Sequence, residues 1–199
     1  AGNRIRGTST ERTTTTGFNT VAGVAGGWKE IGRTTLGTAL DDIVVSSLAD
    51  KRYLMVLTYT GNGSGNINTQ MRLNSDTGSN YSYRASDDGA ADFTGAPKTL
   101  MASGVGGSAS SVPIFDVGYL SNVATKEKLW VQHGVGQRTA GAGTAPNRRE
   151  SVGKHAQTTN PISAVTQHNG EGGDFTAGAE CVVLGWDPAD THTTNFWEE

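Results

Sequence analysis

The feature that most constrains the fold is a succession of short apolar segments, each separated from the next by a cluster of Gly, Asn, Asp and Ser. About ten such segments follow one another at roughly the 8–12-residue spacing typical of sandwiches and barrels. In residues 66–74, Ile67, Met71 and Leu73 recur at even spacing, the period of a strand with one buried face. No segment has helical apolar spacing over three turns, and no strand–helix alternation predicts a parallel sheet. The sequence therefore predicts an all-β fold.

The predicted architecture is an antiparallel β-sandwich of jelly-roll type, because a jelly roll places eight strands in two packed sheets. Residues 99–105 come nearest to a helix start, but they run into glycine. The predicted strands are 27–36, 41–48, 51–61, 66–74, 80–86, 112–120, 127–135, 148–157, 161–169 and 179–187. The predicted core is Tyr53, Leu54, Val56, Leu73, Ile114, Phe115, Leu129, Trp130, Val131, Val182, Val183 and Leu184.

Composition divides the chain into an extended N-terminal arm (1–26), a β-sandwich domain (27–187) and a C-terminal tail (188–199). The chain has 28 glycines, and its hydrophobic (35%) and charged (18%) fractions are low for a soluble domain, which favours short strands and many turns. The arm is too polar to fold alone, so we expect it either to be ordered by a neighbouring subunit or to remain loose. The tail ends in Phe196 and Trp197, which predicts either an intersubunit contact or a frayed end.

Charge and hydropathy exclude several partners. The net charge of −3 argues against a nucleic-acid binder, which would carry a basic face. No apolar run approaches the ~18 residues of a membrane span. Basic residues cluster at Arg148–Arg149 and Lys126–Lys128, with Arg138 as a further candidate. They predict either a solvated face with local ion pairs or a contact with an acidic partner.

Metal-binding patterns are weak. His133, His155, His168 and His192 show no spacing typical of zinc sites, so a histidine site would need distant residues. Residues 74–92 are rich in aspartate but lack the glycine and glutamate positions of an EF-hand loop. A calcium loop of another kind would use Asp76, Asp87, Asp88 and Asp92. The favoured interpretation is a turn, a strand and a second turn, since Asp, Asn and Gly are turn formers.

Catalytic patterns are also weak, and we predict no catalytic, cofactor-binding or metal-binding residues. Asp41–Asp42, Asp87–Asp88 and Glu198–Glu199 are adjacent acids, but neighbours in a strand point to opposite faces. Glu180 and Asp116 are the acids inside apolar strands; Glu180 is expected to point outward. The chain has no G-x-S-x-G motif or phosphate loop. Cys181 is alone and is expected to be a small buried residue.

Several sequence segments, taken in order, resemble a known protein module. They are "GWKEIGRTTLGTALDDIVVSSLADKRYLMVLTYT", "NINTQMRLNSDTGSNYSYRASDDGAAD", "TAGAGTAPNRRESVGK" and "GDFTAGAECVVLGWD". The set resembles structural proteins of tailed bacterial and archaeal viruses, which decorate capsids, form head fibres or associate with tails. The resemblance covers about residues 28–187 and carries no catalytic residues. It implies that residues 72–84 form a hairpin, stiffened by Arg72 and Arg84 pairing with nearby aspartates.

The leading functional hypothesis is a non-enzymatic virion structural protein: a capsid-decorating (cement) or fibre-like component at the particle surface, assembled in the host cytoplasm. Its expected partners are further copies of itself, with a trimer as one option, and the major capsid protein or other virion proteins. The alternative is a carbohydrate-binding module for host glycans, with Trp28, Trp130, Trp186 and Trp197 as stacking platforms. That alternative gains if two of these tryptophans are exposed in one groove and loses if Trp28, Trp130 and Trp186 are buried, as their strand contexts predict. A hydrolase on the same sandwich would need two acids facing across a cleft.

Overall fold

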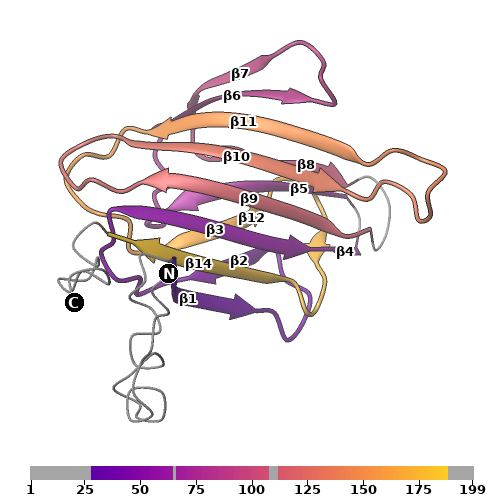
Figure 1. Cartoon of the computed structure of the whole chain (residues 1–199), viewed down its shortest axis with the longest axis horizontal. Coiled ribbons are helices and arrows are strands. Elements are labelled where there is room, and N and C mark those ends of the chain that lie inside the picture. Colours follow the sequence, from indigo (N-terminus) through magenta and orange to yellow (C-terminus); the bar gives the residue numbers. More distant parts are fainter. Residues whose placement is uncertain (1–27, 65, 108–111, 188–199) are drawn as a thin grey trace, which may run out of the picture.

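The computed structural model describes residues 28–64, 66–107 and 112–187, and within these ranges it contains strands and no helix (Figure 1). No helix that could span a membrane is found in these ranges. The predicted arm and tail lie outside them. The strands are β1 (Lys29–Thr35), β2 (Asp42–Val45), β3 (Tyr53–Thr60), β4 (Asn62–Ser64), β5 (Ile67–Leu73), β6 (Tyr81–Asp87), β7 (Phe93–Lys98), β8 (Met101–Gly107), β9 (Ile114–Ser121), β10 (Lys128–Gly136), β11 (Asn147–His155), β12 (Val165–Asn169), β13 (Asp174–Phe175) and β14 (Glu180–Trp186).

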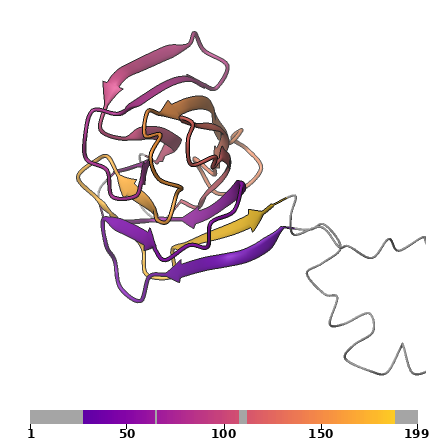
Figure 2. The same cartoon turned by 90° about the vertical axis from the view of Figure 1, so that its left-hand side faces the viewer.

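The strands form two packed antiparallel sheets, so the predicted all-β sandwich is confirmed. The large sheet has eight strands in the order β1-β14-β3-β9-β10-β11-β6-β7, and the small sheet has four in the order β2-β12-β5-β8. A two-stranded ribbon joins β13 and β4. In Figure 1 the large sheet lies in front of the small one, with β1 and β14 at one end and β6 and β7 at the other. Figure 2 shows these two ends from the side.

The connectivity alternates between the sheets. Strands β6 and β7, and strands β10 and β11, extend only the large sheet. When these four and the ribbon strands β4 and β13 are set aside, eight strands remain. The large sheet then holds the first, eighth, third and sixth of them, and the small sheet holds the second, seventh, fourth and fifth. This order places β1 beside β14, near opposite ends of the sequence.

The hairpin expected in residues 72–84 is wrong. β5 belongs to the small sheet and β6 to the large one, so the turn between them crosses from one sheet to the other. The turn itself is where the sequence placed it, and Asn74 and Ser75 adopt φ of 53° and 55°, which short polar residues tolerate. Arg84 does pair with Asp92, at 3.1 Å, but Arg72 Nε is buried without a hydrogen-bond partner among the described residues.

Residues 99–105 do not start a helix but lead into β8. The segment lacks strand periodicity because its glycine is needed for close packing between the sheets. A Cβ on Gly104 would collide with the side chains of Thr69 and Asp116. Tertiary packing, rather than local propensity, therefore decides the conformation here.

The core lies between the sheets and is formed by alternate residues of each strand. In β5 the side chains of Ile67, Thr69, Met71 and Leu73 are all buried, as the period of two predicts. Cys181 is also buried, as expected, and burial raises the pKa of its thiol to about 12. The predicted core residues that are buried are Leu54, Val56, Leu73, Ile114, Trp130, Val182 and Val183.

Three predicted core residues are wrong. Phe115, Leu129 and Val131 point to solvent and are 45%, 57% and 41% exposed. They alternate with buried residues along β9 and β10, so they occupy the outer face of the large sheet. Tyr53 and Leu184 are half-buried on the same face. An apolar run on both faces of a strand cannot be assigned to one side from the sequence alone.

Two polar side chains, Lys128 and His155, are buried at one end of the sandwich. Lys128 Nζ donates hydrogen bonds to the carbonyls of Val123, Ala124, Lys126 and Gln157 at 2.8–3.3 Å, and burial lowers its pKa. This ammonium therefore organises the loop between β9 and β10.

The second group is His155, whose ring stacks on Tyr81 at a centroid distance of 4.4 Å. Its Nε2 lies 2.7 Å from Asp76 Oδ2. Burial alone would raise the pKa of Asp76, but hydrogen bonds from His155, Asn80 and the Gly78 amide lower it overall. The inter-sheet turn is thus tied to β11 by a side-chain network.

Candidate functional site

The four aspartates weighed as a calcium loop do not come together. Asp76 bonds to His155, whereas Asp87 accepts two hydrogen bonds from Arg149, at 2.6 and 2.9 Å. Asp88 accepts one from the Arg148 amide at 2.8 Å, and Asp92 pairs with Arg84. Among the described residues these carboxylates serve separate structural contacts, which agrees with the turn interpretation.

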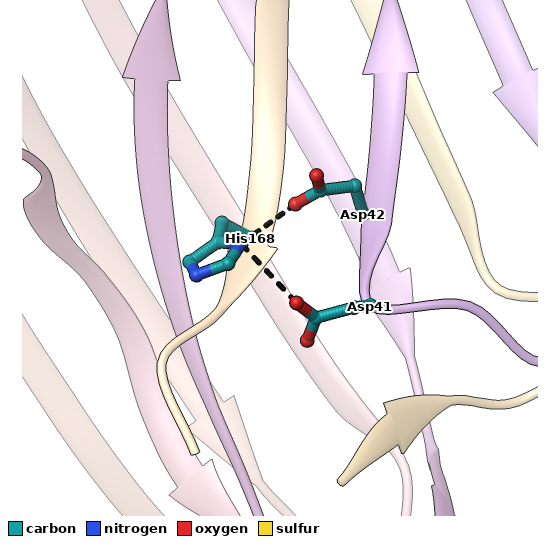
Figure 3. A group of neighbouring side chains, drawn as sticks. All are labelled: Asp41, Asp42 and His168. Atoms are coloured by element: carbon teal, nitrogen blue, oxygen red, sulfur yellow. Dashed lines mark hydrogen bonds and ion pairs between the residues drawn. The ribbon is translucent and has the colours of Figure 1, made fainter. Parts of the chain in front are cut away.

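A different cluster, Asp41, Asp42 and His168, could hold a metal ion (Figure 3). His168 Nδ1 lies 2.7 Å from Asp42 Oδ1 and 3.6 Å from Asp41 Oδ2. Both carboxylates point toward the imidazole, from the start of β2, while His168 projects from β12. The argument that adjacent acids face apart fails here because Asp41 precedes the strand and is not bound by its alternation.

The chemistry of this cluster is that of a half-exposed ion pair. Burial raises the pKa of Asp41, the nearby charges of Asp42 and Asp174 act in the same direction, and His168 opposes them. Three ligand atoms within 4.8 Å of one another match part of a divalent-cation site. Exposed Asp–His groups also occur as plain ion pairs without a metal ion. Here the His168 imidazole already contacts the carboxylates of both Asp41 and Asp42.

Asp116 is the most perturbed acid of the described chain. It lies on β9 between the sheets and is 1% exposed, and burial raises its pKa to about 7. Its Oδ2 accepts a hydrogen bond from Thr69 Oγ1 at 3.1 Å, and its Oδ1 has no partner among the described residues. A Cβ on Gly104 or Gly134 would strike this carboxylate, so backbone closes over it from two strands. Asp116 therefore sits in the packed interior rather than in a cleft.

Glu180, the other acid in an apolar strand, points outward as predicted. It accepts hydrogen bonds from Arg33 at 2.8 Å and Thr35 at 2.7 Å. The hydrogen bond from Thr35, followed by that from Arg33, lowers its pKa. Glu180 lies on the outer face of the large sheet, whereas Asp116 is buried between the sheets, so these two acids do not form the facing pair needed for glycoside hydrolysis.

The basic residues fall into two groups. Arg148 and Arg138 are exposed and lie 3.2 Å from Glu150 and 4.0 Å from Asp88, which matches a solvated face with local ion pairs. Arg149 and Lys128 are buried, so the solvated interpretation is wrong for them. Arg149 spans the two sheets, because it also donates to Gly104 O at 2.6 Å.

The largest unassigned feature is the apolar outer face of the large sheet. Its side chains belong to β3, β9, β10 and β11 and point away from the small sheet. The exposed side chains among them are 40–57% accessible to solvent. Side chains directly opposite one another in an antiparallel sheet share a face, so the register shows that the patch is continuous. The apolar outer face consists of Tyr59, Phe115, Tyr119, Leu129, Val131, Val135 and Val152, with half-buried Met55, Leu57 and Val117 between them.

One row of this face crosses five strands without a polar residue. It runs Leu184, Met55, Tyr119, Val131, Val152 from β14 to β11. The next position, on β6, is Arg84. Arg84 thus ends this row. The neighbouring row on the same face carries Leu57 and Val117 but also His133 and Glu150, so polar groups enter the patch on β10 and β11.

The edges of the large sheet are less available than its face. β1 carries a register shift between Glu30 and Gly32 and charges at Lys29 and Arg33. β7 contains Pro97, which has no N–H to donate to another strand. Bulges, charges and proline are the devices by which edge strands avoid pairing. A partner would therefore dock on the face more readily than extend the sheet.

The tryptophans differ from expectation. Trp28 was expected to be buried but is 39% exposed, and its ring lies 6.2 Å from that of Tyr119 over the apolar outer face. Trp130 is buried as predicted, and Trp186 is half-buried under Tyr53, whose ring stacks on it at 5.3 Å. Trp197 lies outside the described residues. Neither the two-tryptophan groove nor complete burial is found in the described part of the chain.

Sequence reasoning missed both the apolar outer face and the Asp41–Asp42–His168 cluster. The available signal for the face was the consecutive apolar run Leu129–Val131, since a strand that is apolar on both sides has two surfaces to cover. The cluster joins residues 126 positions apart and left no local signal. Comparison with protein-family models and with curated proteins gives no match for this chain.

Proposed function

We propose that this chain is a non-enzymatic structural protein that acts by assembly, as a capsid-decorating or fibre-like component of a virus particle. The observation that carries the assembly role is the apolar outer face. An apolar surface that crosses five strands of one sheet exceeds the scattered exposed residues normal for a monomer. Its partners would be further copies of the chain, the major capsid protein or other virion proteins.

The sandwich suits a rigid building block. The strand order of the eight alternating strands supports the jelly-roll form, with β6–β7 and β10–β11 as additions to one sheet. Arg149 on the large sheet donates to Gly104 O of the small sheet and fixes the layers against each other, and Lys128 holds the loop between β9 and β10. Weak contacts made by many identical copies would then add up through multivalency.

The viral part of the proposal rests on the sequence phrases that resemble virion modules. Its test is co-sedimentation: antibodies raised against the purified chain are applied to density-gradient fractions of virus-sized particles from the source material. The expected result is a signal in the particle band that salt-washed, particle-free fractions lack. A chain found as free monomer, with no signal in any particle band, would contradict the virion role.

One observation favours the carbohydrate-binding alternative. Trp28 and Tyr119 form an exposed pair of aromatic rings on a flat face, which is a surface suited to sugar stacking. Titration of the chain with a panel of oligosaccharides, by calorimetry, would separate the two roles. Binding abolished by Trp28→Ala would support glycan attachment, and no heat with any sugar would remove it.

A further inference from the structure

The apolar outer face has two halves of different shape. On β3 and β9 it carries the large aromatic side chains of Tyr59, Phe115 and Tyr119. On β10 and β11 it carries the smaller side chains of Val131, Val135 and Val152, with Leu129 at one end of β10. Projecting rings beside a shallower valine surface are complementary to each other. A surface that contains both halves can pair with a second copy of itself.

We infer that the apolar outer faces of two copies pack against each other about a two-fold axis that runs parallel to the strands, between β9 and β10. This inference rests on the proposed assembly function and names the partner. In such an isologous contact each β9 lies over the partner's β10, and the reverse contact is identical. Sheets packed face to face stand ~10 Å apart with their strands ~30° from parallel, so the matching holds best near the axis.

Under this two-fold rotation, the side chains of β9 face the side chains of the partner's β10, the strands nearest the axis. Tyr119 and Val131 are neighbours in the register, so Tyr119 of each copy falls over Val131 of the other. Phe115 and Val135 are related in the same way four residues further along, and in the row between them Val117 falls over His133. Each contact sets an aromatic ring against a β-branched side chain, an arrangement that packs without leaving a void.

The strands farther from the axis, β3 and β11, bring aromatic rings opposite cationic side chains. β3 falls over the partner's β11, so Tyr59 meets Arg148 and Tyr53 meets Lys154, where a cation can lie on an aromatic ring. Met55 meets Val152 in the row between them. Glu150 is the exception, but its charge is already paired with Arg148 at 3.2 Å. Arg148 and Lys154 thus fall at the rim, where they keep contact with water.

The apolar outer face is large enough for contact with one partner. From β14 to β6 the sheet spans five interstrand spacings, about 24 Å, and Leu129 to Val135 spans about 20 Å along the strand. The face therefore projects about 500 Å². Standard-size interfaces bury about 800 Å² of accessible surface per partner, and accessible surface exceeds its projection. The whole face is needed for one such contact.

The test compares Val131→Glu with Val44→Glu. Both valines are exposed strand residues, 41% and 44% accessible, but Val44 lies on β2 in the small sheet. By analytical ultracentrifugation, the full-length chain and Val44→Glu should form dimers. Val131→Glu should weaken the dimer by roughly a hundredfold or more, because each copy buries a new carboxylate. Circular dichroism of the monomer checks that Val131→Glu remains folded. Equal dimerisation of both variants would overturn the inference.

A cross-link tests the axis itself. Chains carrying Tyr119→Cys and Val131→Cys are mixed and treated with a short bis-maleimide, because ~10 Å between sheets is too long for a disulfide. Cys181 is buried and provides no competing thiol. The inference requires that the mixed pair cross-link faster than either variant alone. A trimer, or equal rates, would refute the two-fold contact while leaving the assembly function standing. A monomer at all concentrations that is also absent from particles would remove both.

Discussion

Replacing Asp116 by Asn should change how the stability of this protein depends on pH. Asp116 is 1% exposed, and its Oδ1 has no hydrogen-bond partner among the described residues, so the charged carboxylate is poorly compensated. Asn has almost the same shape and is neutral at every pH. Its amide can donate to Thr69 Oγ1, in place of the 3.1 Å hydrogen bond that the carboxylate now accepts.

The magnitude follows from the pKa. Burial raises the pKa of Asp116 from 3.8 to about 7 in the folded protein. Between these values the unfolded chain has released the proton and the folded chain still holds it, so stability falls as pH rises. At 1.36 kcal/mol per pKa unit, the contribution lost across this window is ~4 kcal/mol. Below pH 4 the native chain and the variant should differ little, and above pH 7 the variant should be more stable by up to that amount.

The assay is urea unfolding of both proteins at a series of pH values from 4 to 8. The difference between their unfolding free energies isolates Asp116, because the other titrating groups are common to both. Glu180→Gln is the control of opposite sign. Since hydrogen bonds lower the pKa of Glu180, its contribution is present at neutral pH and is lost as pH falls through its folded pKa. A flat Asp116 difference curve, or one in which the native chain gains stability with rising pH, would refute the reasoning.

Three further changes test the interior and the surface. Lys128→Met strands the carbonyls that now accept from the ammonium and should lower the unfolding free energy by about 3 kcal/mol in urea titration; an unchanged midpoint would contradict a structural role. Gly153→Ala places a Cβ against the Trp130 indole and 2.8 Å from a backbone oxygen, so a loss of roughly 1–3 kcal/mol is expected, whereas Gly37→Ala, with nothing within 4 Å, should change little. Asp42→Asn removes a half-exposed ion pair and should shift stability by less than ~1 kcal/mol, which thermal unfolding would check.

The sequence predicted strands and their buried side chains correctly where one face of a strand is buried and the other faces solvent. The period of two in Ile67–Leu73 predicted both the strand and its buried side chains, because each residue there meets a single environment. It was uninformative where both faces are apolar. Leu129 and Trp130 are neighbours of similar hydropathy, yet one is 57% exposed and the other 4%. Only the pairing register decides which of them faces the small sheet.

The candidate sites depended on contacts that no local pattern records. The sequence of β8 gives a poor strand pattern because Gly104 leaves space for the carboxylate of Asp116, which lies on another strand. Asp41 was assigned to a strand that begins one residue later, and this single residue allows its carboxylate to reach His168. Turn chemistry transferred better: the Asn74–Ser75 turn was placed correctly even though its two strands separate into different sheets.

The position of β14 has a consequence for synthesis of the chain. β14 lies between β1 and β3 in the large sheet and is paired with both. About 150 residues separate β1 from β14, so at ~5–20 residues per second a ribosome needs roughly 8–30 s to deliver the missing strand. During that interval β1 has no neighbour in its sheet and β3 lacks one of its two. The nascent chain must therefore wait for β14 before the sheet closes. A stop codon ahead of Glu180 would leave β1 without a strand partner and β3 paired with β9 alone, rather than yield a smaller sandwich.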